Sequence, residues 1–189
     1  MQRELVTRAI EGDHDAFSVL VRASLVRLYT AASLILRDGD RAQDAVQEAL
    51  VAAWRDVRML RDPDAWDAWV HRLTVRACYR AARRHRRRDL VELHVEPDPA
   101  AAMSTDLTLS VDERDRVERG LGHLPLDQRT VLVLRFYADL PLADVADILD
   151  IPIGTAKSRL HRGLAALRTS LDAPSIGGAS GQLIQERSA

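Results

Sequence analysis

Cysteine is almost absent from this chain, and its scarcity excludes two common kinds of site. Cys78 is the only cysteine among 189 residues, so no disulfide can form within the chain. The six histidines are scattered, and neither CxxC nor HxxxH spacing, which metal sites usually require, occurs. The composition therefore predicts no metal site and no cofactor.

Long apolar runs are also missing, although 47% of the residues are hydrophobic. No uninterrupted apolar run approaches the roughly 18 residues that a membrane span needs. The first residues include Glu4 and lack the apolar stretch of a secretory signal. We therefore expect a globular protein that is not inserted in a membrane and acts in the cytoplasm.

Acidic residues are absent from two segments of the chain, although its net charge is only -1. A charged partner responds to such local separation of charge more than to the net value. Residues 68–88 contain no acid and eight arginines. Residues 89–113 invert the sign, with seven acids and no basic residue. Residues 151–171 are again free of acids and carry four basic residues. A function has to explain these two basic segments and the acidic connector between them.

Strand-like alternation does not persist anywhere, whereas residues that start and stop helices are frequent. Asp13 is placed to cap a first helix over residues 15–36, and Gly39 to end it in a left-handed conformation. Asp40 is placed to cap a second helix over residues 41–57. The pattern thus predicts an all-α fold from its first segment onward.

A third helix is predicted over residues 64–88, beginning at Asp64. Its apolar stripe includes Trp66 and Trp69, which either stack on extruded bases or, as is more common for such a stripe, belong to a core. Beside the stripe, arginines recur every four residues: Arg72, Arg76, Arg80 and Arg84. This ladder suits contacts with the phosphates of a single strand, and the alternative is a solvated helix face.

The second half of the chain predicts a separate helical domain. Residues 95–110 are rich in proline, alanine and acids without periodicity, which is typical of a flexible linker. Four helices are predicted after it, over residues 111–121, 126–137, 142–149 and 153–171. The glycine- and serine-rich residues 173–189 are predicted to be a disordered tail. The fold class is therefore all-α, with two small helical domains, 1–94 and 111–172, joined by a flexible acidic linker.

The last two helices are predicted to form a helix-turn-helix, because only residues 150–152 separate them. One side of the final helix is apolar. Its other side gathers Lys157, Ser158, His161 and Arg162, with Thr155 interleaved. A solvated face usually carries both signs of charge, so this basic face favours contact with DNA over simple exposure to water.

Three of these segments resemble bacterial RNA polymerase sigma factors of the extracytoplasmic-function group, in the sigma-70 family. Residues 124–168 are similar to the family's fourth domain and carry the pattern P-x-G-T-x-K-S-R-L-x-R at residues 152–162. Residues 40–54 resemble the second-domain helix that docks on core polymerase. Residues 64–88 resemble the helix that melts the promoter and reads its minus-ten element. The resemblance covers about residues 13–171.

The resemblance implies a promoter-specificity subunit that performs no chemistry itself. It implies contact of Asp44, Gln47 and Glu48 with core polymerase, where the alternative is an ordinary exposed helix face. The implied minus-ten DNA contacts are Arg61, Trp66, Arg72, Arg76, Arg80, Arg83, Arg84 and Arg87. The implied minus-thirty-five contacts are Thr155, Lys157, Ser158, His161 and Arg162. Family analogy adds an anti-sigma factor to the expected partners, core RNA polymerase and promoter DNA, and places the chain on the nucleoid through the polymerase.

Two rival functions fit parts of the sequence. A free-standing helix-turn-helix regulator would use residues 111–172 and leave the first domain unexplained. A helical nuclease would need clustered carboxylates to hold metal, whereas the acids here lie in helix caps or in the linker. Mixing the purified chain with core polymerase separates the three functions, since they predict promoter-dependent transcripts, DNA binding without polymerase, and cleavage respectively.

Overall fold

The computed structural model describes residues 1–89 and 111–172, and within those two ranges the chain contains helices and no strand. The N-terminal bundle consists of α1 (Gln2–Ile10), α2 (His14–Leu36), α3 (Gly39–Asp56) and α4 (Trp66–Asp89), with the short 3-10 helices Val57–Met59 and Pro63–Ala65 before α4. The C-terminal bundle consists of α5 (Val111–Gly122), α6 (Leu126–Leu132), the π-helical segment η3 (Val133–Tyr137), α7 (Leu142–Leu149) and α8 (Ile153–Asp172). The all-α prediction is confirmed. The predicted linker and tail lie outside the described residues.

The first helix boundaries follow the predicted caps in one case and depart from them in another. Asp13 caps α2 as predicted, its Oδ1 accepting from the backbone N–H groups of Asp15 and Ala16 at 2.9 and 3.0 Å. The predicted cap Asp40 is wrong, because Asp38 caps α3. The Asp38 carboxylate holds Arg41 twice, accepting from its backbone N–H at 2.8 Å and from its Nε at 2.6 Å.

The left-handed residue between α2 and α3 also differs from the prediction. Arg37, with φ of 57°, takes this conformation, and Gly39 is instead the first residue of α3. The two hydrogen bonds from Arg41 to the Asp38 carboxylate fix the start of α3. The left-handed residue is therefore Arg37, two positions before the predicted Gly39. A non-glycine residue is tolerated there because the Arg37 N–H still donates to the carbonyl of Ser33 at 2.7 Å.

Helix α1 was not predicted from the sequence. It buries only Val6 and Ala9, which is too sparse an apolar pattern to signal a helix. Two exposed contacts tie it to neighbouring segments: Arg3 pairs at 2.6 Å with Asp64 in the 3-10 helix before α4, and Gln2 donates at 3.1 Å to Asp67 in the first turn of α4. Tertiary packing rather than local pattern therefore decides that this segment is helical.

Helix α2 is long and apolar enough, by length and composition, to cross a membrane, with a mean hydropathy of 1.6 over its most apolar window. The sequence-based exclusion of such a segment counted only uninterrupted apolar runs and missed it. In the fold, α2 packs against α1, α3 and α4 and buries Phe17, Leu20, Leu28 and Ile35. Core helices of globular bundles pass the same composition test, and 33% of the apolar window of α2 is buried inside this fold.

The core of the N-terminal bundle combines small and large side chains. Ala42, Ala45, Ala49 and Ala53 line the buried side of α3 and allow α2 and α4 to approach it closely. Trp66, only 1% exposed, fills the space at the start of α4 and meets the ring of Phe17 edge-on at 6.0 Å. This packing fixes α3 against α4 along much of their length, which sets the relative positions of the side chains on their outer faces.

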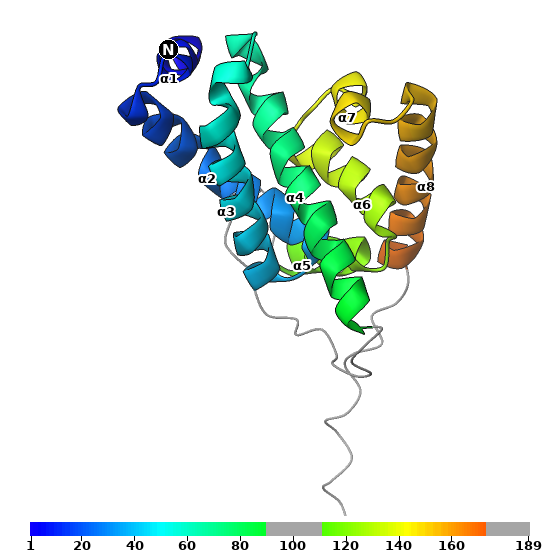
Figure 1. Cartoon of the computed structure of the whole chain (residues 1–189). Coiled ribbons are helices and arrows are strands. Elements are labelled where there is room, and N and C mark those ends of the chain that lie inside the picture. The colour runs from blue at the N-terminus through cyan, green and yellow to red at the C-terminus, as the bar shows by residue number, and fades with distance from the viewer. Residues whose placement is uncertain (90–110, 173–189) are drawn as a thin grey trace, which may run out of the picture.

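The two bundles are packed against each other rather than held apart. Figure 1 shows α4 between α3 on one side and α6 and α7 on the other. α6 and η3 also pack on α2. Buried residues of the C-terminal bundle, including Leu134, Val145 and Ile148, belong to the same hydrophobic cluster as the N-terminal core. The prediction of two helical units is thus met by two bundles that share one apolar interface.

Candidate nucleic-acid interface

The predicted helix-turn-helix is present in α7 and α8. α7 ends at Leu149, its C-cap residue Asp150 adopts a left-handed φ of 55°, and the N–H of Ile151 donates to the carbonyl of Ala146 at 3.0 Å. The carbonyl of Pro152 then accepts from the N–H of Thr155 at 2.9 Å, which opens α8. A three-residue turn therefore fixes the angle between α7 and α8.

The two sides of α8 differ in exposure as the periodicity predicted. Ala156 and Gly163 are buried, and a side chain on Gly163 would come within 3.2 Å of Leu132, so α8 lies close against α6. The opposite side presents the predicted minus-thirty-five side chains, all exposed except the partly buried Thr155: Lys157, Ser158, His161 and Arg162. These side chains form one polar, basic surface at the start of the second helix of the motif.

The arginines predicted to contact the minus-ten strand lie in three different environments. Arg76 and Arg83 are exposed, as is Arg61 in the loop before α4. Arg72 is partly buried and donates to the backbone carbonyl of Asp147 on α7 at 2.8 Å. Arg80 and Arg84 both bind Glu48 on α3. The side chain of Arg87 lies outside the described residues. Of the four ladder arginines, only Arg76 is both exposed and without an ion pair to another described residue.

Trp66 is removed from the minus-ten candidates. Its ring is buried between α2 and α4, and its Nε1 donates to the hydroxyl of Ser24 at 3.4 Å. A buried indole offers no face on which a base could stack. The alternative interpretation of the tryptophan stripe, a core position, is therefore the correct one for Trp66, whereas Trp69 is only partly buried.

The candidate polymerase-binding residues lie on the outer side of α3. Asp44 and Gln47 are exposed, and Glu48 is partly buried and faces α4. The spacing of four residues between the two acids places them one turn apart on one face. Sequence reasoning grouped them as equivalent, but within the described part of the chain Asp44 forms no ion pair while Glu48 forms two.

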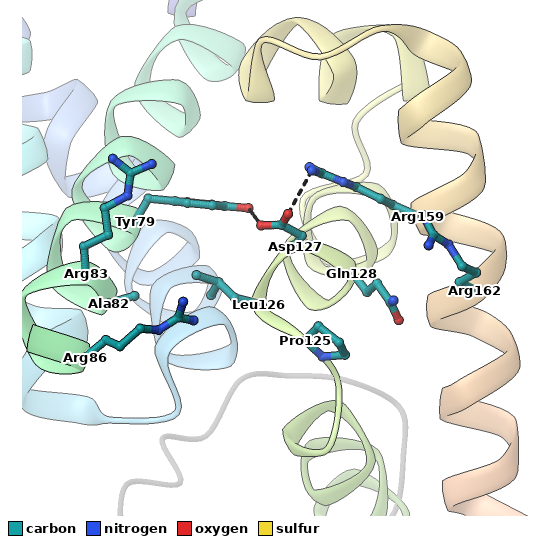
Figure 2. A pocket seen from close by; sticks show the side chains of 10 residues that line it. All are labelled: Tyr79, Ala82, Arg83, Arg86, Pro125, Leu126, Asp127, Gln128, Arg159 and Arg162. Atoms are coloured by element: carbon teal, nitrogen blue, oxygen red, sulfur yellow. Dashed lines mark hydrogen bonds and ion pairs between the residues drawn. The ribbon is translucent and has the colours of Figure 1, made fainter. Parts of the chain in front are cut away.

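A pocket of about 500 Å³ lies between the bundles, and Figure 2 shows that side chains of α4 and α8 line its opposite walls. Asp127, near the start of α6, bridges the walls: Tyr79 Oη donates to its Oδ1 at 2.9 Å, and Arg159 Nη2 pairs with its Oδ2 at 2.8 Å. Burial and the Asp127 carboxylate raise the pKa of Tyr79 to about 12. The minus-ten candidate Arg83 and the minus-thirty-five candidate Arg162 line this same pocket.

Sequence reasoning missed the residues that join the bundles. Tyr79, Asp127 and Arg37 carry no motif, and they matter only because the fold brings distant segments together. Arg37 donates from Nη1 to the carbonyl of Gly122 at 3.1 Å, beside the buried Arg129. Burial and the neighbouring charge of Arg37 lower the pKa of Arg129 to about 10.

Two groups with perturbed pKa values lie in the N-terminal bundle. Burial raises the pKa of the Cys78 thiol to about 12, so the thiol is not poised as a nucleophile. Burial lowers the pKa of His71, whose Nδ1 lies 3.0 Å from the carbonyl of Asp67. Among the residues that the structure describes, no group of three or more histidine, cysteine or acidic side chains is placed to hold a metal ion.

Comparison with known proteins gives two family matches that coincide with the two bundles. The family described as Sigma-70 region 2 matches residues 20–88, and Sigma-70 region 4 matches residues 114–167. The chain is 34% identical over 164 residues to the ECF RNA polymerase sigma factor SigM of Mycobacterium tuberculosis, covering 87% of this chain and 81% of that protein. It is 31% identical over 173 residues to the ECF RNA polymerase sigma-E factor of Escherichia coli K12, covering 86% and 90%.

Two solved structures share the fold of the whole described chain. CnrH in complex with the cytosolic domain of CnrY superposes with a TM-score of 0.68 and 27% identity, over 92% of this chain and 99% of that one. The sigma factor RpoE in complex with the anti-sigma factor NepR, from Bartonella quintana, gives a TM-score of 0.71 and 25% identity, over 84% and 98%. The similarity therefore extends across both bundles and not to one of them alone.

Proposed function

Because this chain belongs to the extracytoplasmic-function group of sigma-70 RNA polymerase sigma factors, which direct promoter-specific initiation and are not enzymes, we propose how its surfaces divide that work. The observation that carries the proposal is the exposed basic side of α8, the second helix of a helix-turn-helix within region 4. Lys157, Ser158, His161 and Arg162 contact the minus-thirty-five element in the major groove, with Thr155 at its margin.

The minus-ten element is contacted by α4 and the loop before it. Arg61, Arg76 and Arg83 are exposed and carry charge to the phosphates of the melted strand. Arg80 and Arg84 join them once Glu48 releases their guanidinium groups, and Arg72 joins once α4 separates from α7. Arg87 extends the same helix and completes the set.

Core polymerase is bound by the outer side of α3, where Asp44, Gln47 and Glu48 meet basic side chains of the enzyme. An anti-sigma factor is a further partner. The support for it is that both solved structures are complexes with a second protein, one of them the sigma factor RpoE with the anti-sigma factor NepR, and that both share this fold over most of their length. Sigma factors of this group act in the cytoplasm with RNA polymerase, and we place this one on the nucleoid through that enzyme.

A pair of arginine variants separates base reading from phosphate contact. Arg162→Ala should cost about 1–3 kcal/mol on a matched minus-thirty-five element and much less on a scrambled one, because it removes a base contact. Arg76→Ala should weaken all promoters alike and reduce the salt slope of binding by about one. Binding of holoenzyme to both promoters across a salt series measures the two effects. Equal losses for Arg162→Ala on matched and scrambled elements would show that α8 does not read bases through this residue.

A further inference from the structure

Two surfaces that the proposed function treats separately are bonded to each other. Glu48, on the proposed polymerase-binding side of α3, binds two arginines of α4 that we assign to the minus-ten strand. Its Oε1 lies 2.7 Å from Arg80 Nε and its Oε2 lies 3.4 Å from Arg84 Nη2. Both oxygens of one carboxylate are therefore engaged, each by a different arginine.

All three side chains remain accessible to outside partners. Their side-chain exposures are 38% for Glu48, 47% for Arg80 and 55% for Arg84. Within the described part of the chain, neither arginine forms any other ion pair. The three side chains thus form one surface cluster of one negative and two positive charges. A partner that takes the Glu48 carboxylate leaves both arginines without their acidic partner, and a partner that takes the arginines frees Glu48.

The helices that carry this cluster are held rigidly. Ala45 and Ala49 are fully buried on the inner side of α3, where it packs along α4. Exchange of partners at the surface therefore needs only rotations of long side chains and no movement of the two helices. Arginine and glutamate side chains make such rotations readily when they are partly exposed.

We propose that Glu48 couples docking on core polymerase to capture of the minus-ten strand. In the free chain its carboxylate pairs with both Arg80 and Arg84 and compensates one of their two positive charges. When a basic group of the polymerase takes the carboxylate, both arginines become available to DNA phosphates. By linkage, phosphates that bind the arginines release Glu48 and raise the affinity for polymerase by the same factor. The inference rests on the proposed contact of this α3 face with polymerase.

The expected size of the coupling follows from the exposure of the pairs. Exposed ion pairs each contribute a modest free energy, so the coupling should change affinity by about two- to fivefold. This is large enough to measure as a ratio of two dissociation constants determined on the same protein. It is also small enough that each partner still binds alone.

The decisive variant removes both arginines. The full-length chain carrying Arg80→Gln and Arg84→Gln should bind core polymerase about two- to fivefold more tightly than wild type in the absence of DNA, because Glu48 is then unopposed. A variant that merely damaged the fold would bind less tightly. Unchanged or weaker binding to polymerase, at wild-type thermal stability, overturns the proposal.

The second measurement is the ratio of polymerase affinities with and without a single-stranded DNA of about 12 nucleotides, a probe that reports phosphate contacts whatever its sequence. The ratio should exceed one for wild type and fall to near one for Glu48→Gln and for the double arginine variant. If Glu48→Gln keeps the wild-type ratio of polymerase affinities with and without DNA, the proposed coupling is overturned. Arg86→Gln is the matched control on α4, because Arg86 is exposed, forms no ion pair in the described part of the chain and is not among the proposed DNA contacts. It should keep the wild-type ratio, and loss of the ratio there would assign the effect to the charge of α4 in general and overturn the proposal.

Asp44→Asn separates failure of the coupling from failure of the proposed docking face. Asp44 lies one turn before Glu48 and binds no arginine of α4 in the described part of the chain. Asp44→Asn should weaken polymerase binding and leave the DNA-dependent ratio as in wild type, which supports the proposal. If Asp44→Asn and Glu48→Gln both leave polymerase affinity unchanged, the assignment of the α3 face is itself overturned, and the coupling with it.

Discussion

The N-terminal and C-terminal bundles are built from similar helices but are stabilised in different ways. The N-terminal bundle has a continuous core in which Trp66 and Phe17 pack among the buried alanines of α3. The C-terminal bundle has a small second cluster, in which the buried members are Leu121, Leu124 and Leu132. Most of its remaining buried side chains join the N-terminal core. The comparison teaches that the first bundle supports itself, whereas the second depends partly on its neighbour.

The polar contacts across the interface differ from the apolar ones in how easily they can be exchanged. Arg72 donates to the carbonyl of Asp147, Arg37 to that of Gly122, and Tyr79 to the carboxylate of Asp127. Each of these groups can bind water when the bundles separate, so breaking them costs little. We therefore expect the two bundles to separate readily, as domains of one chain commonly do when polar contacts join them.

The largest effect should come from the centre of the self-supporting core. Trp66→Ala should destabilise the N-terminal bundle by about 3–5 kcal/mol, because it empties a large buried site. Urea unfolding followed by circular dichroism measures the loss. Trp69→Ala, at a partly buried position in ring contact with Trp66, is the control and should cost less. Full stability with impaired DNA binding in Trp66→Ala would return this tryptophan to the DNA-binding surface.

The next effect tests whether the C-terminal bundle depends on its neighbour. A fragment of residues 111–172 should be less stable than the same helices in the full chain by about 2–4 kcal/mol, the value of exposing one or two large apolar side chains. A fragment of residues 1–89 should lose much less. Urea midpoints of the fragments and the full chain, read separately for each bundle, measure both losses. Equal losses in the two fragments would contradict the asymmetry.

The sequence predicted much of this fold where a repeating pattern was strong. The helices of the C-terminal bundle and the basic side of α8 follow from apolar periodicity and from the turn at residues 150–152, which are local features. Helix α1 and the cap at Asp38 were missed because distant contacts and a specific pairing with Arg41 decide them. The charge cluster at Glu48 could not be read from spacing, because it joins residues of two helices.

A smaller effect is expected at the bridge between the bundles. Tyr79→Phe removes the hydrogen bond across the interface, and Asp127→Asn also removes the pairing with Arg159. Each should favour opening by about 0.5–2 kcal/mol. Energy transfer between labels on α4 and α8 measures the opening. Arg159→Gln, which breaks only the contact within the C-terminal bundle, is the control and should leave the distance nearly unchanged.

The smallest effect concerns the thiol of Cys78, which is buried in the N-terminal core with its pKa raised to about 12. An alkylating reagent near pH 8 should reach it only when that bundle unfolds. If the N-terminal bundle supports itself, the labelling rate in a fragment of residues 1–89 should differ from that in the full chain by less than about twofold. Much faster labelling in the fragment would show that the N-terminal bundle also depends on its neighbour for stability.

The pocket shared by α4 and α8 has a consequence for how much of this factor a cell must make. Arg83 and Arg162 line one pocket of about 500 Å³, whereas the two promoter elements lie more than one and a half duplex turns, about 50 Å, apart. Under the proposed assignment of Arg83 to the minus-ten element and Arg162 to the minus-thirty-five element, only molecules that have separated their bundles engage both elements. The apparent dissociation constant for promoter-bound polymerase is therefore the intrinsic one divided by the open fraction. A low open fraction therefore raises, in inverse proportion, the concentration of factor that a cell must make for half-maximal promoter occupancy.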